Sequence, residues 1–210
     1  MILYSYFRSS SAHRCRIALN LKEIEHEMRF VHLRKEGGQQ KSDWFRRLNP
    51  QALVPALDTG EGILTQSLAI IEWLDSVYPE PALLPGDAVM RARTRAFSQI
   101  IACDIHPLQN LRVLEHLRST GADQPVIDEW CRKWVGEGLA ACERLLSDRP
   151  LFCFGDTPTL ADVCLVPQIY SARRFEVDIS VFPKLAGVFE RCMQLKAFID
   201  AAPEHQRDFE

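Results

Sequence analysis

The 210-residue sequence contains no stretch of about 18 apolar residues, the length that a membrane-spanning helix needs. It has no contiguous basic run, and its formal net charge of −3 argues against nucleic-acid binding. The first residues, MILYSYFRSSS, lack the basic segment and the cleavage site of a signal peptide. We therefore expect a protein that binds neither a membrane nor a nucleic acid.

The sequence also lacks a CxxC pair, although it contains seven cysteines. Most of them lie in apolar periodic segments, where a cysteine usually serves as a small buried hydrophobic residue. We predict free thiols, no metal site and a reducing, cytoplasmic environment. The cysteines are Cys15, Cys103, Cys131, Cys142, Cys153, Cys164 and Cys192.

Repeats and low-complexity segments are absent, and the composition is that of a globular protein, with 47% hydrophobic and 25% charged residues. The segment PEPALLPGD, residues 79–87, holds three prolines and a glycine, which is typical of a connection between domains. We predict a small α/β domain over residues 1–80 and an all-helical domain over residues 88–210.

In the first domain, strand-like and helix-like patterns alternate. Segments 2–7, 27–33 and 63–66 are rich in β-forming residues, and 49–57 is partly strand-like. Helical patterns run from the serines near residue 9 to residue 22 and over 43–48 and 67–78. The order βαβα followed by ββα combines a crossover unit with a hairpin.

In the second domain, one apolar stripe and one capping motif stand out. The motif TLAD predicts a capping box in which Thr159 caps a helix and Asp162 reaches back. The stripe steps by four residues and predicts a long buried helix face. It comprises Trp130, Trp134, Gly138, Cys142 and Leu146, with Val135, Leu139 and Leu145 as neighbours.

The stretch RSSSAHR, residues 8–14, lies where a strand ends and a helix begins. A helix N-terminus presents unpaired N–H groups and the positive end of the helix dipole, so it can bind an anion. One serine is enough to cap the helix, and the others could simply be solvated. From these residues alone both interpretations remain open.

Two neighbouring patterns favour a ligand site. In LVPAL, residues 53–57, a proline interrupts a strand-like run, and a cis bond between Val54 and Pro55 would explain it. Such a turn would leave the Val54 backbone free to pair with an extended peptide. Gln66 and Ser67 open a further helix and form a second anion site. Together these patterns predict a pocket for a short acidic peptide.

Several longer segments resemble the zeta-class glutathione transferases, a group that includes maleylacetoacetate and maleylpyruvate isomerases. The segments are YSYFRSSSAHRCRIAL, GGQQ, LNPQALVPAL, QSLAIIEWL, LLP, HPLQNLRVL, GDTPTLADVCLVPQ and ARRFEVD, in that order. The resemblance covers nearly the whole chain. It implies a thioredoxin-like N-terminal domain, an all-α C-terminal domain, glutathione as cofactor and a homodimer.

The resemblance also implies roles for individual residues. Ser9 would hold the glutathione sulfur, with Ser10 and Ser11 beside it, and Arg174 would hold the substrate. We add Arg8 as a substrate ligand because it adjoins the sulfur site. The matching glutathione-binding positions are Gln40, Val54 (through its backbone), Pro55, Gln66, Ser67, His106, Asn110, Leu111 and Arg112.

Two positions depart from the family pattern. Ser11 replaces the usual cysteine, which removes any covalent or redox role for that residue. His13 replaces the common aromatic residue, a change more typical of bacterial members, and this leaves the preferred substrate open. His106 could be a general acid or base, or a helix histidine that is simply hydrogen-bonded.

The resemblance implies a glutathione-dependent cis–trans isomerase that acts on a small dicarboxylate. Maleylacetoacetate is the leading substrate, and maleylpyruvate isomerisation or general glutathione conjugation is the alternative. A third possibility is a noncatalytic protein that uses the fold to bind a partner. The complete set of Ser9, Val54–Pro55 and Gln66–Ser67 argues against it.

Overall fold

The computed structural model describes residues 1–148 and 150–210, which form two compact units. The first unit comprises Met1–Ala82 together with Leu195–Glu210, and the second comprises Leu83–Gln194. Each unit is described separately below. No helix in the described part of the chain is long and apolar enough to cross a membrane.

The first unit is built on a four-stranded mixed sheet with the strand order β2-β1-β3-β4. β1 and β2 are parallel, β3 is antiparallel to β1, and β4 is antiparallel to β3, as the βαβ and hairpin patterns predicted. The strands are β1 (Ile2–Ser5), β2 (Glu27–Phe30), β3 (Ala56–Asp58) and β4 (Ile63–Thr65). The expected thioredoxin-like arrangement is present.

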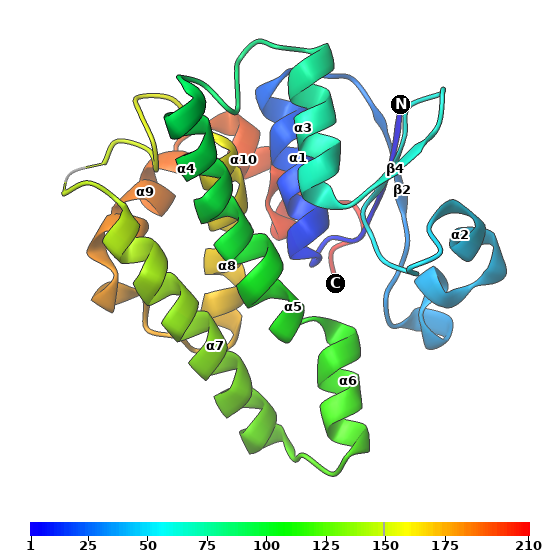
Figure 1. Ribbon diagram of the computed structural model, residues 1–210. Coiled ribbons are helices and arrows are strands. Elements are labelled where there is room, and N and C mark those ends of the chain that lie inside the picture. The colour runs from blue at the N-terminus through cyan, green and yellow to red at the C-terminus, as the bar shows by residue number, and fades with distance from the viewer. Residues whose placement is uncertain (149) are drawn as a thin grey trace. The chain divides into compact units, whose positions relative to one another are not determined.

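Helices cover both sides of this sheet. In Figure 1, α1 and α3 lie together on one side of the strands and α2 lies on the other. The fully buried residues of this unit include Leu3, Ile17, Leu57, Ile70 and Leu74. The helices are α1 (Ser10–Leu21), α2 (Asp43–Leu48), α3 (Ser67–Val77) and α10 (Lys196–Ala201), with short 3₁₀ turns η1 (Lys35–Gly37), η2 (Gln39–Lys41) and η5 (Pro203–His205).

The last residues of the chain belong to the first unit. Helix α10 packs on α1 and buries Phe198 completely. The Asn20 amide donates to the Ala197 carbonyl at 3.0 Å, and the Phe7 N–H donates to the Asp208 carboxylate at 2.9 Å. The unit boundaries therefore differ from the predicted domain of residues 88–210, because these long-range contacts leave no local signal in the sequence.

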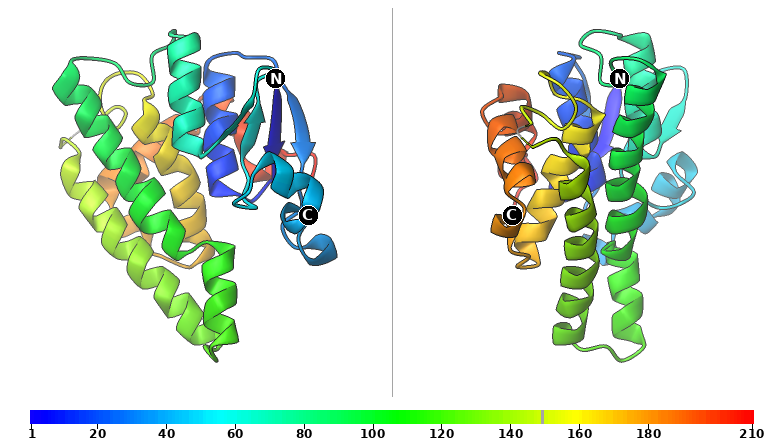
Figure 2. Two further views of the ribbon diagram at one scale, coloured as in Figure 1. Left: turned by 45° about the vertical axis from the view of Figure 1, so that its right-hand side comes forward. Right: turned by 60° about the vertical axis from the view of Figure 1, so that its left-hand side comes forward.

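The second unit is helical. Figure 2 shows α4 and α7 as its long neighbouring helices, with α6 leading into α7. Its elements are α4 (Ala88–Gln99), the π-helical segment η3 (Ile100–Ile105), α5 (His106–Leu108), α6 (Leu111–Ser119), α7 (Gln124–Leu145), α8 (Leu160–Arg174), the 3₁₀ turn η4 (Ile179–Val181) and α9 (Pro183–Cys192).

The predicted buried face of α7 is confirmed at Cys142, Val135 and Leu139, but its centre is displaced about the helix axis away from the two tryptophans. The residues of this helix that are fully buried are Ile127, Cys131, Val135, Leu139 and Cys142. Trp130 and Trp134 lie at the margin, partly exposed, and Leu145 is exposed. Tryptophan often takes such a position because its N–H needs a partner, and the Trp130 Nε1–H donates to the Leu108 carbonyl at 2.8 Å.

Gly138 lies at a close approach between α7 and η3. A Cβ atom at this position would overlap the Cγ1 and Cδ1 atoms of Ile105, whose side chain is buried. A larger residue would therefore force the helices apart. Gly138, which lies on the predicted stripe, therefore allows α7 to pack closely against Ile105 of η3.

The predicted capping box is present at the start of α8. The Thr159 N–H and Oγ1–H both donate to the Asp162 Oδ2 atom at 2.8 Å. Both side chains are fully buried. The next residue, Leu160, links the start of α8 to the beginning of this unit, because its N–H donates to the Leu83 carbonyl at 2.8 Å.

Candidate active site

Ser9 is the residue that caps α1. Its backbone is extended, and its Oγ atom accepts a hydrogen bond from the Ala12 N–H at 3.2 Å. Ser10 is the first helical residue and is buried, whereas Ser9 and Ser11 are partly exposed. The cap and the predicted sulfur-binding hydroxyl are therefore one and the same residue.

Ser11 connects this helix end to the proline turn. Its hydroxyl donates to the Val54 carbonyl at 3.2 Å, and its Oγ atom lies 3.2 Å from that of Ser9. Because the single Ser11 proton is used on Val54, the Ser9 hydroxyl is the donor between the two serines. The Ser9 proton is thus held by a neighbouring hydroxyl and can be redirected to a stronger acceptor.

The Val54–Pro55 peptide bond is cis, as predicted. The sequence suggested that the Val54 backbone is free, but its carbonyl accepts a hydrogen bond from Ser11. A carbonyl oxygen has a second lone pair, which can still accept from another donor. Asn49, which is buried, supports this turn: its amide donates to the Leu53 carbonyl at 2.7 Å and its Oδ1 accepts from the Gln51 N–H at 3.1 Å.

Gln66 precedes α3 in an unusual backbone conformation. Its φ of 68° and ψ of 116° fall in a region that residues other than glycine rarely adopt. Its side-chain amide donates to the Gln51 Oε1 atom at 2.7 Å. Strained backbone of this kind is concentrated at ligand sites, where the surrounding structure maintains it.

Hydrogen bonds join three chain segments around the serines. Ser11 links α1 to the cis-proline turn, and Gln51 links that turn to Gln66. Ser67, the first residue of α3, accepts a hydrogen bond from the Nη1 atom of Arg14 on α1 at 3.2 Å. Hydrogen bonds of the first unit therefore link the segments that carry the serines, Val54–Pro55 and Gln66–Ser67.

Gln40 and Arg8 lie on other segments of the same unit. Gln40 is buried, and its amide donates to the Leu33 carbonyl at 3.3 Å, while its Oε1 atom has no hydrogen-bond partner among the described residues. Arg8 lines a pocket of about 360 Å³. The other lining residues are Tyr6, Phe7, His32, Arg34, Lys35 and Glu210.

The pocket beside Arg8 is mainly basic. The Glu210 carboxylate forms an ion pair there with Lys35, and its Oε2 atom lies 3.4 Å from the His32 Nε2 atom. The Arg8 guanidinium lies over the Phe7 ring, 5.7 Å from its centre. This group of cations suits a carboxylate ligand.

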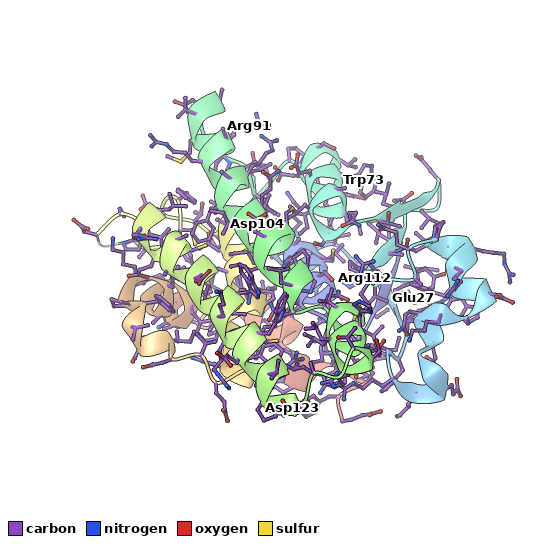
Figure 3. The ribbon with its side chains drawn as sticks, turned by 60° about the horizontal axis from the view of Figure 1, so that its bottom comes forward. Glu27, Trp73, Arg91, Asp104, Arg112 and Asp123 are labelled. Carbon is purple, nitrogen blue, oxygen red and sulfur yellow. The ribbon has the colours of Figure 1, made fainter. Side chains whose placement is uncertain are left out.

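The helical unit carries the remaining candidates. The π-helical segment η3 ends just before His106, because Pro107 has no N–H to continue regular helical bonding. Asn110 caps α6 through a bond from the Arg112 N–H to its Oδ1 atom at 3.2 Å. Leu111 is the first residue of α6, and Arg112 is exposed at the start of that helix (Figure 3).

Arg174 lies in the last turn of α8, exposed, with its guanidinium 4.4 Å from the centre of the Phe175 ring. Phe175 in turn packs with Leu114 of α6 and Cys131 of α7. Arg174 and the segment that begins at His106 therefore border one hydrophobic cluster of the helical unit.

The buried cysteines are not candidate nucleophiles. All seven are free, and Cys103 alone among them is exposed. Burial raises the pKa of the Cys131 thiol to about 11 and that of Cys142 to about 12. Because the thiolate is the reactive form, these side chains remain inert near neutral pH. Within residues 1–148 and 150–210, no group of three or more His, Cys, Asp or Glu side chains could hold a metal ion.

His13, which is almost completely buried, should make stability depend on pH. Burial lowers the pKa of His13 well below 6.5, and the charges of Arg16 and Arg14 lower it further. Below about pH 6.5 the unfolded chain takes up a proton that the folded protein does not, so we expect acidification to destabilise the protein by up to about 1.4 kcal/mol per pH unit. Above that pH, His13 contributes no pH dependence.

Urea unfolding of the wild type and of His13→Gln at about pH 7.5 and about pH 5.5 measures this effect. The difference between the two free energies of unfolding should change by about 1.4 kcal/mol across that range. Parallel changes in the two proteins would show that His13 is protonated equally in the folded and unfolded states.

The fold and site define a class of protein. A thioredoxin-like unit with a hydroxyl at the start of the first helix, a cis-proline turn and a serine at the start of α3, followed by a helical unit, is the glutathione transferase architecture. The family models for the glutathione S-transferase N-terminal and C-terminal domains match residues 8–77 and 124–191.

Individual relatives narrow the family. A maleylpyruvate isomerase of Ralstonia sp is 53% identical over 99% of both chains. A holo structure of a zeta-class maleylpyruvate isomerase aligns with a TM-score of 0.96 at 52% identity and covers both chains fully. A maleylacetoacetate isomerase from Anaeromyxobacter dehalogenans with bound glutathione is 42% identical, with a TM-score of 0.89, over 100% and 97% of the two chains. The chain belongs to the zeta class of the glutathione S-transferase family.

Sequence reasoning missed several supporting residues. Asn49 and Gln51 hold the proline turn, and Asn-Pro in LNPQ could have marked them as turn residues. Arg14 had no local signal, because its contact with Ser67 joins residues that are 53 positions apart.

Proposed function

We propose that this protein is a glutathione-dependent cis–trans isomerase that acts on a maleyl dicarboxylate. Maleylacetoacetate remains the leading substrate. Maleylpyruvate is the second candidate, supported by the 53% identity to the Ralstonia enzyme and by His13. The observation that carries the proposal is the hydrogen-bonded arrangement of Ser9, Ser11 and Val54 at the start of α1.

The donor set of the first unit fits glutathione. The α3 N-terminus with Ser67 suits the γ-glutamyl carboxylate, and Val54 offers a backbone edge for the peptide. Gln40 has a buried amide oxygen ready to accept a ligand N–H. His106 and the segment Asn110–Arg112 would add contacts from the helical unit.

Bound glutathione would supply a nucleophilic thiol, whose reversible addition to an activated double bond permits rotation. A free thiol has a pKa of about 8.5, and lowering it by two units requires about 2.7 kcal/mol of preference for the anion. The Ser9 hydroxyl could contribute about 1.5–3 kcal/mol and the α1 N-terminus about 0.3–1 kcal/mol. These two contributions are sufficient.

Arg8 and Arg174 would hold the carboxylates of the substrate, and Ser10 and Ser11 would support Ser9. General conjugating activity is compatible with the same residues. We further propose that the protein is a cytoplasmic homodimer. Six buried free thiols suit a reducing compartment, and dimerisation follows from family membership.

Each maleyl substrate should be mixed with the protein in the presence and absence of glutathione, while isomerisation is followed by ultraviolet absorbance. We expect turnover only with glutathione, and the ratio of kcat/KM values ranks the two substrates. Equally fast turnover without glutathione would overturn the proposed mechanism. Binding of glutathione without isomerisation of either substrate would indicate a conjugating transferase instead.

A further inference from the structure

Helix α1 contains two arginines whose side chains are almost fully buried, Arg14 and Arg16. Arg16 is well satisfied by hydrogen bonds to the carbonyls of Tyr6, Phe7 and Ala201 and to the Ser5 hydroxyl. These bonds tie α1 to β1 and to the returning C-terminal segment. The burial of Arg16 therefore has a structural explanation.

Arg14 is different. It is 1% exposed, and the only side-chain hydrogen bond that it makes with the described residues runs from Nη1 to the Ser67 Oγ atom at 3.2 Å. The Nε and Nη2 atoms are buried and have no partner among residues 1–148 and 150–210. A guanidinium stays protonated in proteins and has five N–H donors, so this is a buried cation that the fold leaves uncompensated.

Among the described residues, no acidic side chain is hydrogen-bonded to the Arg14 guanidinium. Its neighbour His13 has a lowered pKa, partly because the charges of Arg14 and Arg16 oppose its protonation, so that side chain is neutral at pH 7. In the described part of the chain, no ion pair joins Arg14 to an acidic residue. An uncompensated buried charge is costly, and it is retained most readily where a ligand supplies the opposite charge.

The hydrogen bond to Ser67 shows where that opposite charge would act. Because the Ser67 oxygen accepts from Arg14, the Ser67 hydroxyl proton remains available to a second acceptor. Ser67 also begins α3, a helix of 11 residues whose first N–H groups attract anions. A carboxylate at this position would meet a hydroxyl that is polarised by the guanidinium behind it.

We propose that Arg14 is a positioning residue for glutathione binding: through Ser67 it supplies the positive charge that the γ-glutamyl carboxylate of the ligand balances. This inference rests on the proposed function, because it assumes that glutathione is the ligand. Arg14 does not touch the carboxylate itself. It orients the Ser67 hydroxyl and strengthens it as a donor.

The test measures the affinity of the full chain by calorimetry for glutathione and for 4-aminobutyryl-cysteinyl-glycine, which lacks only that carboxylate. The ratio of the two Kd values reports what the carboxylate contributes. Arg14→Met should weaken glutathione binding about 10–100-fold and bring the ratio close to one. Arg14→Lys keeps the positive charge, so its ratio of Kd values should lie close to that of the wild type. Arg14→Gln keeps only a hydrogen-bond donor, so its ratio should stay close to one.

Arg91→Met serves as a matched control, because Arg91 is exposed on α4 (Figure 3) and its loss changes the net charge equally. Its ratio should equal that of the wild type. A wild-type ratio in folded Arg14→Met or Arg14→Gln would overturn the inference, and if the Met variant does not fold, the Lys and Gln variants decide it. Failure of the wild type to bind glutathione would instead overturn the proposed function.

Discussion

Ser9→Ala should lower kcat/KM for isomerisation about 10–100-fold, because the variant loses a hydroxyl hydrogen bond to a charged acceptor. In the structure, the Ser9 hydroxyl donates only to the neighbouring Ser11 oxygen, so its proton can be given to a thiolate. The pKa of the bound glutathione thiol should rise correspondingly, by about 1–2 units. Ultraviolet absorbance of the thiolate as a function of pH measures this shift.

The double role of Ser9 requires a control for stability. Its Oγ atom also caps α1, and loss of such a cap costs about 0.5–2 kcal/mol. Ser9→Gly replaces the cap with one that is only a few tenths of a kcal/mol poorer, so it should keep most of the stability and still lose the activity. Ser11→Ala removes the bond to the Val54 carbonyl and should cause a much smaller loss of turnover.

Equal and small losses in Ser9→Ala and Ser11→Ala would reduce Ser9 to a helix cap. Retention of full activity in Ser9→Gly would do the same. A large loss in Ser11→Ala alone would assign the hydroxyl function to the residue that stands where relatives carry a cysteine. The three variants therefore separate the capping role of Ser9 from its role as a donor to the sulfur, and both from the role of Ser11.

Asp162→Ala should destabilise the protein by about 3–5 kcal/mol, because the variant leaves three buried donors without an acceptor. The Asp162 carboxylate accepts from the Cys153 N–H, the Thr159 N–H and the Thr159 hydroxyl, each at 2.8 Å. Burial raises the pKa of Asp162, and these hydrogen bonds oppose that shift. Helix α8, whose start they hold, is buried along most of its length.

Urea unfolding gives the loss of stability for Asp162→Ala. Asp156 provides the control, since it lies exposed in the same loop, and Asp156→Ala should change the free energy of unfolding by less than about 0.5 kcal/mol. Asp162→Asn keeps one acceptor oxygen, so its loss of unfolding free energy should lie between those of Asp162→Ala and Asp156→Ala. Similar small effects of Asp162→Ala and Asp156→Ala would show that the capping box contributes little.

Several features of this protein could be predicted from the sequence because they depend on neighbouring residues. The helix over 43–48 was predicted with its observed bounds, and the capping box of Thr159 and Asp162 was predicted from four residues. A proline inside a strand-like run suggested a cis bond at Pro55, and the structure has it. The resemblance of the whole chain to one family then implied the mixed sheet and the thiol chemistry.

The rotation of α7 could not be read from the sequence. Its apolar residues lie on two adjacent lines, and the sequence placed the centre of the stripe on the line of Trp130 and Trp134, with Val135 and Leu139 beside it. The structure buries the line that contains Cys131, Val135 and Leu139, because close packing against the other helices admits the smaller side chains. The tryptophans remain at the margin, where the Trp130 N–H finds a carbonyl.

By itself, the sequence determined the order of strands and helices in the first unit and, through the family resemblance, the class of chemistry, since each depends on local pattern or on family membership. Only the tertiary structure decided which groups meet: Ser11 with Val54, Gln51 with Gln66, and Arg14 with Ser67. It also decided that the last residues of the chain return to α1. The physical reason is that such contacts depend on packing between distant segments, which leaves no periodic trace in the chain.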